Sequence, residues 1–347
     1  MVEITPYEAR DSSFYQSRVN NLFYSERWLA VLQKTYDYRY LTVLDLSTEQ
    51  FIIVTVLDHL AGKKVISLPF CDYTPIDNAH QKSLAPMVQA LQERYPQYRI
   101  ILKTGLPAPL TTTNDKALDW LGEPTRQAFY HRINTTDLRA IEQSSSFRRG
   151  VKKARKAGVT VEIGTDEATL QDFYQMYCQL RFDKFNSIPQ PYEFFKNVYR
   201  EFIATGQGFV LQARRQHQVI ASIIVLQHRE TLYYKFGCSD QQALPYRPNN
   251  LLFQRLIELA AEKGCTAIDL GLSGTGASYE GLVRFKESMG GVRHPISYFT
   301  ITPEGYDERS EKECQAVLTS LTRTMVEQRL SVEATSQLSA TIYPYFA

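Results

Sequence analysis

The chain has 347 residues, of which 44% are hydrophobic and 12% aromatic, and its formal net charge at pH 7 is +2. This composition predicts a folded chain large enough for two domains and excludes an intrinsically disordered one. The near-neutral charge disfavours a nucleic-acid-binding protein that is basic along its whole length, although it allows one local basic patch.

The cysteines and histidines give no sign of disulfides or metal sites. The six histidines lack metal-ligand spacing, so we expect no metal. The first residues lack the features of a secretory signal, and no apolar run approaches the roughly 20 residues of a membrane span. Five scattered cysteines without a C-x-x-C pair are typical of reduced thiols, so we expect a cytoplasmic protein. These cysteines are Cys71, Cys178, Cys238, Cys265 and Cys314.

The first part of the chain is predicted to be mixed α/β. Ser25 is a suitable N-cap for a helix that runs through Gln33. Two apolar runs, residues 51–57 and 65–68, are separated by a polar turn and predict a β-hairpin. The remaining elements expected here are a helix over 80–95 and strands over 99–103 and 128–134.

The second part begins with a basic helix over residues 144–157, which Gly158 ends. The elements after it alternate in a way that predicts a mixed α/β layer. They are strands over 159–163, 209–213, 219–226, 231–236 and 266–271, and helices over 167–181, 191–205 and 250–262.

The domain boundary is placed at the basic helix. We therefore expect an N-terminal domain over residues 1–143 and a C-terminal domain over 144–303. Residues 304–347 are expected to form a helix, over about 307–328, and a tail. This segment either returns to the first domain or supports a dimer, and the oligomeric state stays open.

Four parts of the sequence carry a family resemblance. They are Leu68-Pro-Phe-Cys-Asp-Tyr73; the basic run Arg148–Gly158; Leu180-Arg181 with Phe194-Phe195; and Pro248–Gly264 continued by Asp269-Leu-Gly271, Phe285-Lys286 and Gly290. In this order they resemble the FemAB-like branch of the GNAT (Gcn5-related) acyltransferases. The resemblance implies an α/β fold with mixed sheets, made of two GNAT-like domains with a cleft between them, and transfer of an acyl or aminoacyl group to an amine.

Two departures from the family pattern bear on the donor. Acetyl-CoA-dependent members carry a glycine-rich loop whose N–H groups hold the pyrophosphate at a helix N-terminus. The corresponding segment here, Cys238–Pro248, contains no glycine between its ends, so a simple acetyl-CoA site is disfavoured. The chain also lacks the long helical hairpin of some cell-wall enzymes.

The resemblance places Lys286 at the active site with Phe285 beside it. Lys286 is expected to stabilise the oxyanion or to bind a donor phosphate, the alternative being a surface lysine beside a core phenylalanine. Asp72 is expected to orient or deprotonate the amine, the alternative being a turn-stabilising residue before Pro75. These three, Lys286, Phe285 and Asp72, are the expected catalytic residues.

Substrate-binding residues are expected on both halves of the chain. Arg181 has the planar fork that binds phosphate or carboxylate, the alternative being an ion pair with Asp183. Asp269 at a strand end either contacts the ligand or caps the following loop. The expected substrate-binding residues are Arg181, Tyr73, Asp269, Tyr234 and Asn249, and the expected cofactor-binding residues, which flank candidate backbone donors, are Tyr233, Phe236 and Gly237.

The expected function is an N-acyltransferase that uses an activated acyl carrier. Acyl-CoA or an acyl carrier protein, with a long acyl chain, would acylate an amine of a peptide, a sugar or a cell-wall precursor, and no cofactor would be bound permanently. One alternative is an aminoacyl-tRNA-dependent transferase, with tRNA contact at the cationic run Arg148–Lys156, although such runs are more often solvated helix faces. Another is a non-catalytic binding protein with a GNAT fold.

Overall fold

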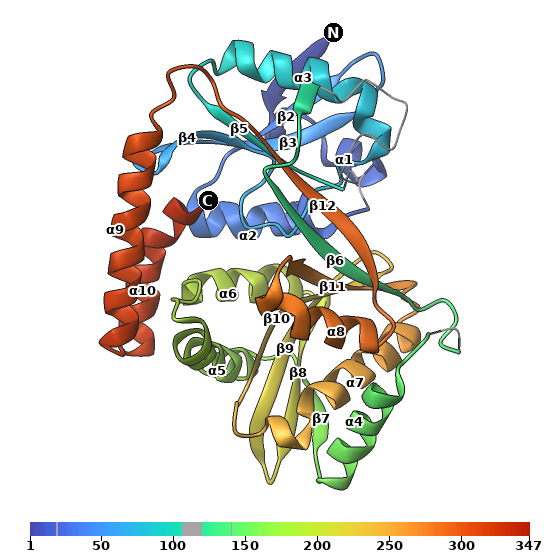
Figure 1. The fold of residues 1–347 in the computed structure, drawn as a ribbon. Coiled ribbons are helices and arrows are strands. Elements are labelled where there is room, and N and C mark those ends of the chain that lie inside the picture. Colours follow the sequence, from blue (N-terminus) through green and yellow to red (C-terminus); the bar gives the residue numbers. More distant parts are fainter. Residues whose placement is uncertain (19, 106–119, 140) are drawn as a thin grey trace. The chain divides into compact units, whose positions relative to one another are not determined.

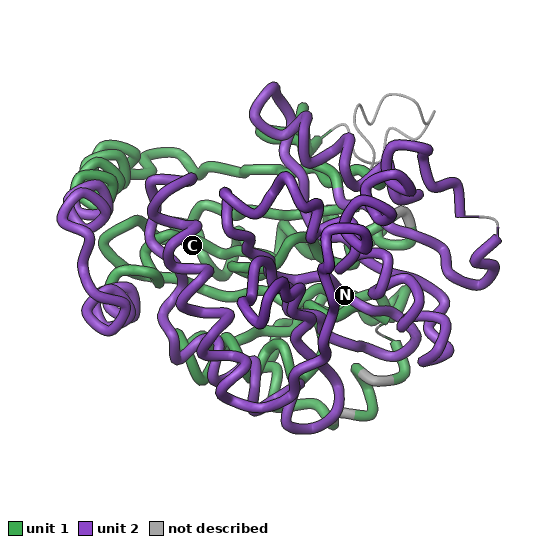
Figure 2. The backbone as a smooth tube through the Cα atoms, turned by 90° about the horizontal axis from the view of Figure 1, so that it is seen from below, with its two compact units in different colours: residues 1–129, 294–320, 342–347 green, residues 130–293, 321–341 purple. Residues whose placement is uncertain are grey.

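The computed structural model describes residues 1–18, 20–105, 120–139 and 141–347 (Figure 1). The chain forms two compact units, shown in separate colours in Figure 2. Unit 1 comprises residues 1–129, 294–320 and 342–347, and unit 2 comprises residues 130–293 and 321–341. Both units combine helices with a mixed sheet, which confirms the predicted α/β class.

Unit 1 contains a sheet in the order β1-β2-β3-β4-β5-β12. Its neighbouring strands are antiparallel except for the parallel pair β4 and β5. The elements are β1 (Val2–Pro6), α1 (Ser12–Arg18), α2 (Glu26–Tyr36), β2 (Tyr40–Asp45), β3 (Phe51–His59), β4 (Gly62–Ile66), α3 (Gln81–Arg94), β5 (Arg99–Thr104) and β12 (Val292–Ile301).

Local signals explain the helices of unit 1. The Ser25 side chain accepts a hydrogen bond from the backbone N–H of Trp28 at 3.3 Å, so it caps α2 as predicted. In α3 the buried residues Leu84, Met87 and Leu91 recur at helical spacing, and they belong to the core formed with strands β2 to β5.

Unit 2 contains a sheet in the order β6-β11-β10-β9-β8-β7, in which β10 and β11 are parallel. Helices α4 and α7 pack on one face of the sheet and α5 and α6 on the other (Figure 1). The elements are β6 (Arg126–Asn134), α4 (Ser145–Lys156), β7 (Thr160–Gly164), α5 (Glu167–Phe185), α6 (Tyr192–Val198), a π-helical turn (Tyr199–Ile203), β8 (Gly208–Arg215), β9 (Gln218–His228), β10 (Thr231–Ser239), α7 (Pro248–Glu262), β11 (Ala267–Gly274) and α8 (Glu280–Ser288).

The two units repeat one order of elements. Each has a strand, two helices, three antiparallel strands, a helix and a strand that returns parallel to the third strand of the three. In unit 1 the returning strand is β5, and in unit 2 it is β11. This repetition fits the two GNAT-like domains that the sequence resemblance implied.

The unit borders differ from the predicted residues 143/144 and 303/304. Unit 1 ends within β6, at residue 129, and takes up the chain again within β12, at residue 294. Strand pairing explains the second border, because Ser297 to Ile301 of β12 pair with Thr104 to Ile100 of β5.

The C-terminal segment forms two helices, α9 (Glu308–Glu327) and α10 (Val332–Ile342), followed by residues that belong to unit 1. In that last stretch the Tyr343 ring stacks on Tyr36, and the Tyr38 hydroxyl donates to the Pro344 carbonyl at 3.4 Å.

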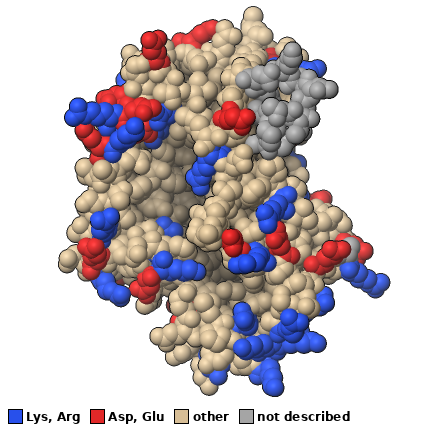
Figure 3. Space-filling model, in the orientation of Figure 1, with Lys and Arg blue, Asp and Glu red and all other residues tan. Residues whose placement is uncertain are grey.

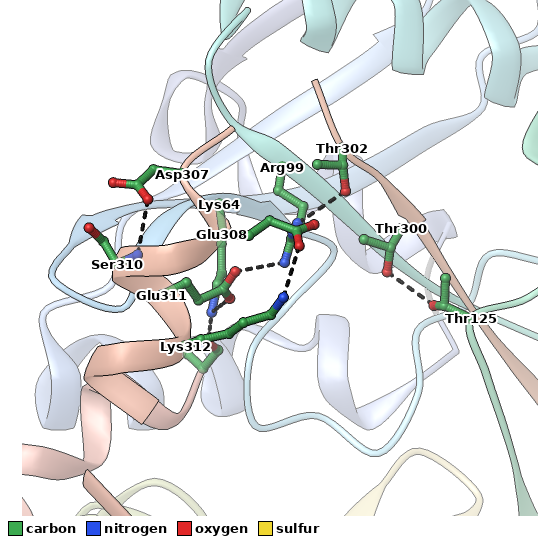
Figure 4. A network of polar contacts seen from close by, with 11 residues as sticks. Lys64, Arg99, Thr125, Thr300, Thr302, Asp307, Glu308, Ser310, Glu311 and Lys312 are labelled. Carbon is green, nitrogen blue, oxygen red and sulfur yellow. Dashed lines mark hydrogen bonds and ion pairs between the residues drawn. The ribbon is translucent and has the colours of Figure 1, made fainter. Parts of the chain in front are cut away.

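A buried network of charges holds the start of α9 on unit 1 (Figure 4). The Arg99 guanidinium pairs with Glu308 at 2.9 Å and with Glu311 at 2.7 Å. Lys64 Nζ lies 3.0 Å from Glu311 and also donates to the Ala347 carbonyl at 3.1 Å. Because Lys64 is almost fully buried, the loss of these partners would leave a buried charge uncompensated.

Candidate functional site

The site lies where the two parallel strands of unit 2 separate. Strands β10 and β11 pair over three rungs, from Thr231 opposite Ala267 to Tyr233 opposite Asp269. Both strands then continue, β10 to Ser239 and β11 to Gly274, without further rungs between them. The separation opens the edge of β10 at a strand end, where a ligand can pair with backbone groups.

A β-bulge lies at the start of this opening. The register of β10 on β9 shifts between Tyr234 and Phe236, so the alternation of side chains changes there. The Tyr234 ring packs edge-on against Phe253 of α7 at 4.9 Å. The Phe236 ring instead lies 5.2 Å from Phe195 of α6 on the opposite face of the sheet. The bulge therefore supplies aromatic side chains to both faces of the opening.

Lys286 of α8 is buried, with 2% of its surface exposed, which excludes the surface-lysine alternative. Its ammonium donates to the carbonyl oxygens of Gly271 at 2.8 Å and Leu272 at 2.9 Å and to the Ser273 hydroxyl at 3.0 Å. These bonds satisfy backbone groups of β11 beyond the last rung with β10. In this geometry Lys286 fixes the position of the separated strand end.

Asp269 shapes the same strand end. Its side chain accepts a hydrogen bond from the Gly271 N–H at 2.7 Å, within β11 and before the loop that it was expected to cap. Gly271 has φ of 72°, a left-handed conformation that glycine adopts without steric cost. The strand thus bends directly after its last rung with β10.

Phe285 lies on the α4 and α7 side of the sheet. Its ring is 5.5 Å from Phe253 and 6.2 Å from Phe147. It also lines a cavity of about 430 Å³ between α4, α7 and α8, which we call the basic cavity. Four cationic residues line the basic cavity, namely Arg149, Lys153, Arg247 and Arg284.

Few carboxylates compensate the positive charge of the basic cavity. Arg284 lies 3.6 Å from Glu280, but among the described residues no carboxylate lies within 4.0 Å of Arg149, Lys153 or Arg247. Three uncompensated cations around one cavity favour an anionic ligand.

Close packing of two helices builds the basic cavity. A Cβ atom on Gly150 would lie 2.4 Å from the Asn250 side chain, so glycine lets α4 approach the start of α7. The Asn250 amide donates to the Phe147 carbonyl at 3.4 Å across this contact. Arg247 adopts the left-handed conformation, φ 60° and ψ 40°, at the N-cap of α7. Arg247 therefore lies in the segment that corresponds to the family's glycine-rich loop, which this sequence lacks.

Three of the predicted residues support the end of β10. The Tyr234 ring covers Gly237, where a Cβ atom would lie 2.5 Å from the Tyr234 hydroxyl. Asn249 accepts a hydrogen bond from the Ser239 hydroxyl at 2.9 Å. Tyr233 is buried in the last rung opposite Asp269. Together these contacts fix the strand edge that the opening exposes.

Arg181 lies in the last turns of α5 and contacts the segment that connects α5 to α6. Its Nε donates to the Ile188 carbonyl at 3.3 Å, and its guanidinium lies 5.5 Å from the Phe185 ring. Asp183, the acid named as its alternative partner, pairs with Arg329 at 3.4 Å.

Asp72 and Tyr73 belong to unit 1. Tyr73 is buried and packs edge-on against Phe23 at 5.2 Å, while Asp72 is half-buried. Their loop follows β4, and Lys103 Nζ donates to its Leu68 and Cys71 carbonyls at 2.8 and 3.0 Å. In unit 1 the loop that follows β4 is thus tied to β5 at the end of the parallel pair β4 and β5.

Other chemistries find no support among the described residues. No three His, Cys, Asp or Glu side chains gather there to hold a metal ion, and no described helix is both long and apolar enough to cross a membrane. Among the described residues none of the five cysteines is joined in a disulfide. Burial raises the pKa of Cys178 to about 12 and also raises the pKa of Cys238, so these thiols are protonated and unreactive at neutral pH.

Comparison with known proteins identifies the class. Residues 142–287 match the family model of the acetyltransferase (GNAT) domain, which spans α4 to α8. This segment therefore forms a GNAT domain, and the expected GNAT superfamily is confirmed for it. No curated protein matches the sequence.

Solved structures share the fold of this chain. FemX has 15% sequence identity and a TM-score of 0.60 over 83% of this chain and 94% of that one. L-PGS from Bacillus licheniformis has 12% identity and a TM-score of 0.54 over 91% and 95% of the two chains. At this level of identity the likeness concerns the fold, so donor and acceptor have to be argued from the residues.

Proposed function

We propose that the protein is an N-acyltransferase that moves an acyl group from a phosphate-bearing thioester to a primary amine. The single observation that carries the proposal is the separation of β10 and β11 beyond Tyr233 and Asp269 in the unit that also contains the basic cavity with its four cations. The first feature offers backbone donors to a carbonyl group, and the second offers a counter-charge to the donor's phosphate.

In the proposed reaction the amine nitrogen attacks the thioester carbon. A C–N bond forms, the C–S bond breaks, and the proton lost by the amine compensates the charge of the leaving thiolate. The tetrahedral intermediate carries an oxyanion, for which backbone N–H groups of β10 near Tyr233, Phe236 and Gly237 are the proposed donors.

Lys286 acts in this proposal as a positioning residue. Its three hydrogen bonds hold the end of β11 away from β10 and so maintain the opening. The earlier expectation that Lys286 itself stabilises the oxyanion or binds phosphate stays a prediction. The expected contribution of Asp72 as the group that orients or deprotonates the amine likewise stays a proposal.

Unit 2, not unit 1, is the proposed donor-binding unit. In unit 1 the chain leaves β4 after Ile66, and Lys103 ties the following loop over the strand end through Leu68 and Cys71. In unit 2 both parallel strands continue past their last rung. We therefore propose that the thioester binds in unit 2, along the edge of β10 beyond its last rung with β11.

The aromatic lining favours a long acyl chain over acetyl. The half-buried Phe236 lies beside Tyr177, Phe194 and Phe195, with ring centroids 5.2 to 6.1 Å away. Of these four rings only Phe236 is partly exposed, and each methylene group that it removes from water would contribute about 0.8 kcal/mol. We propose a peptide, sugar or cell-wall precursor as the carrier of the acceptor amine.

The test is amide formation. The full chain is incubated with hexadecanoyl-CoA or acetyl-CoA and with glucosamine or a lysine-containing peptide, and products are detected by mass spectrometry. We expect an amide with the long-chain thioester at a higher kcat/KM than with acetyl-CoA. Absence of amide with every thioester, together with product from aminoacyl-tRNA, would refute the proposal and favour the tRNA-dependent reaction.

A further inference from the structure

Helix α4 presents a cationic face, of which the proposed chemistry requires only the part that lines the basic cavity. Six cations occupy nine consecutive positions, Arg148 to Lys156, and all six side chains are exposed. The buried residues of α4, namely Phe147, Gly150, Val151 and Ala154, lie on its opposite side. At about 100° per residue the cations cover an arc of about 160°. Figure 3 shows this concentration of Lys and Arg at the lower edge of the molecule.

The cationic face divides into two stripes. Arg149 and Lys153, one turn apart, line the basic cavity together with Arg247 and Arg284. The other stripe consists of Arg148, Lys152, Arg155 and Lys156, and we call it the outer stripe. Its only ion pair among the described residues joins Arg155 to Glu258 at 3.7 Å, so most of its charge is uncompensated.

The charge is also unevenly divided between the units. Unit 2 contains 24 Lys and Arg against 18 Asp and Glu, a formal charge of +6, whereas unit 1 contains 15 against 19, a formal charge of −4. The near-zero total therefore conceals a positive unit whose cations concentrate on α4. Such an asymmetry indicates an anionic partner on that side of unit 2.

We propose that the outer stripe docks an acidic carrier protein, whose phosphate-linked thioester arm enters the basic cavity. This inference rests on the proposed acyl transfer and names the carrier of the donor. A helix of 12 residues is about 18 Å long, so the stripe matches one acidic helix of a small partner. Its cations would meet the partner's carboxylates and raise the rate of encounter.

The basic cavity fits one phosphate group better than the diphosphate of coenzyme A. Backbone donors at the start of α7 are few, because Pro248 has no N–H and the Asn250 N–H donates to the Arg247 carbonyl at 3.1 Å. Anion binding there depends on the four cationic side chains. A carrier protein's arm holds a single phosphodiester, which these side chains can surround.

Two observations favour a protein over RNA as the partner. The exposed face of α4 carries no aromatic side chain on which a base could stack. The stripe also borders a carboxylate of α7, since Glu258 lies 3.7 Å from Arg155. An RNA backbone that continued past the stripe at this point would meet that negative charge.

The test measures binding of a purified acyl carrier protein loaded with hexadecanoate to the full chain. The variant Lys152→Glu with Lys156→Glu reverses the outer stripe, and Lys82→Glu with Lys184→Glu makes the same charge change at exposed positions elsewhere. We expect the stripe variant to weaken binding about tenfold or more and added salt to weaken wild-type binding. The control variant should bind within about twofold of wild type.

Turnover of the small thioester hexadecanoyl-phosphopantetheine separates this inference from the proposed function. If the inference holds, the stripe variant loses turnover of the carrier-bound donor and keeps turnover of the small thioester. Equal binding by the stripe and control variants, or displacement of the carrier by an equal concentration of transfer RNA, would overturn it. Failure of the wild type to acylate any amine with the small thioester would instead overturn the proposed function.

Discussion

The ammonium of Lys286 donates a hydrogen bond to the carbonyl oxygen of Gly271 at 2.8 Å, and this contact joins α8 to the end of β11 just beyond the last rung with β10. The same ammonium also donates to the Leu272 carbonyl and the Ser273 hydroxyl. The opening between the strands therefore depends on a cation contributed by a different element.

We expect Lys286→Met to reduce the free energy of unfolding by about 1 to 3 kcal/mol, because buried acceptors lose their donor. We also expect kcat for amide formation to fall by about 100-fold or more, since the donors of the opening lose their alignment. Urea unfolding and steady-state kinetics measure the two effects. Ser273→Ala removes one acceptor and should cost much less, and full activity of Lys286→Met would contradict the positioning role.

Gly237→Ala tests the edge of β10. The added Cβ would lie 2.5 Å from the Tyr234 hydroxyl and 3.0 Å from its ring, so Tyr234 has to leave its packing on Phe253. We expect a rise in KM for the thioester and a loss of about 1 to 3 kcal/mol in stability. Tyr234→Phe, which removes the closest atom, should partly rescue Gly237→Ala. A wild-type KM in Gly237→Ala would argue against donor binding at this edge.

Glu311→Gln tests the network that holds α9 on unit 1. Glu311 pairs with both Lys64 and Arg99, and Lys64 is 4% exposed at its side chain. Removal of one partner leaves a buried charge uncompensated, which costs about 3 to 5 kcal/mol. Glu308→Gln is the matched control, because the 52% exposed Glu308 side chain should contribute less than about 1 kcal/mol. Urea unfolding measures both, and equal effects would contradict the assignment.

The N-cap of α5 gives a prediction for pH dependence. The Thr169 backbone N–H donates to Asp166 at 2.7 Å and lowers the pKa of this carboxyl below its ordinary 3.8. Because the folded pKa lies below the unfolded one, the stabilisation is complete above pH 3.8 and is lost as the pH falls through the folded pKa.

We expect Asp166→Ala to cost about 1 kcal/mol at neutral pH, the usual value of an N-cap, and less at about pH 3. Urea unfolding at both pH values measures this difference. Asp166→Asn keeps the cap without a titrating group, so its stability difference from Asp166→Ala should not change with pH. A cost of Asp166→Ala that grows on acidification would reverse the predicted sign.

The sequence by itself determined the elements whose signals are local. The Ser25 cap, the apolar spacing in α3 and the amphipathic pattern of α4 each depend on residues within a few turns, so these helices were predicted almost to their ends. The order of elements in unit 2 followed from the same signals, and with the family motifs it led to the GNAT domain that the family model confirms.

No prediction from the sequence covered β1, α1, β2, α8, β12 or α10. Strand β12 contains Pro295 and begins with exposed residues, so its pattern is not that of an ordinary strand. It forms because it pairs with β5, a segment about 200 residues earlier in the chain. Pairing over such a separation leaves no local signal.

The candidate site was determined only in part by sequence. The motif pointed to Lys286, yet its acceptors Gly271, Leu272 and Ser273 could not be assigned before β11 and α8 were placed. The basic run of α4 was visible, but the basic cavity also needs Arg247 from the start of α7 and Arg284 from α8. Tertiary packing decided this arrangement, because electrostatic and hydrogen-bonding partners are selected by distance in space and not by distance along the chain.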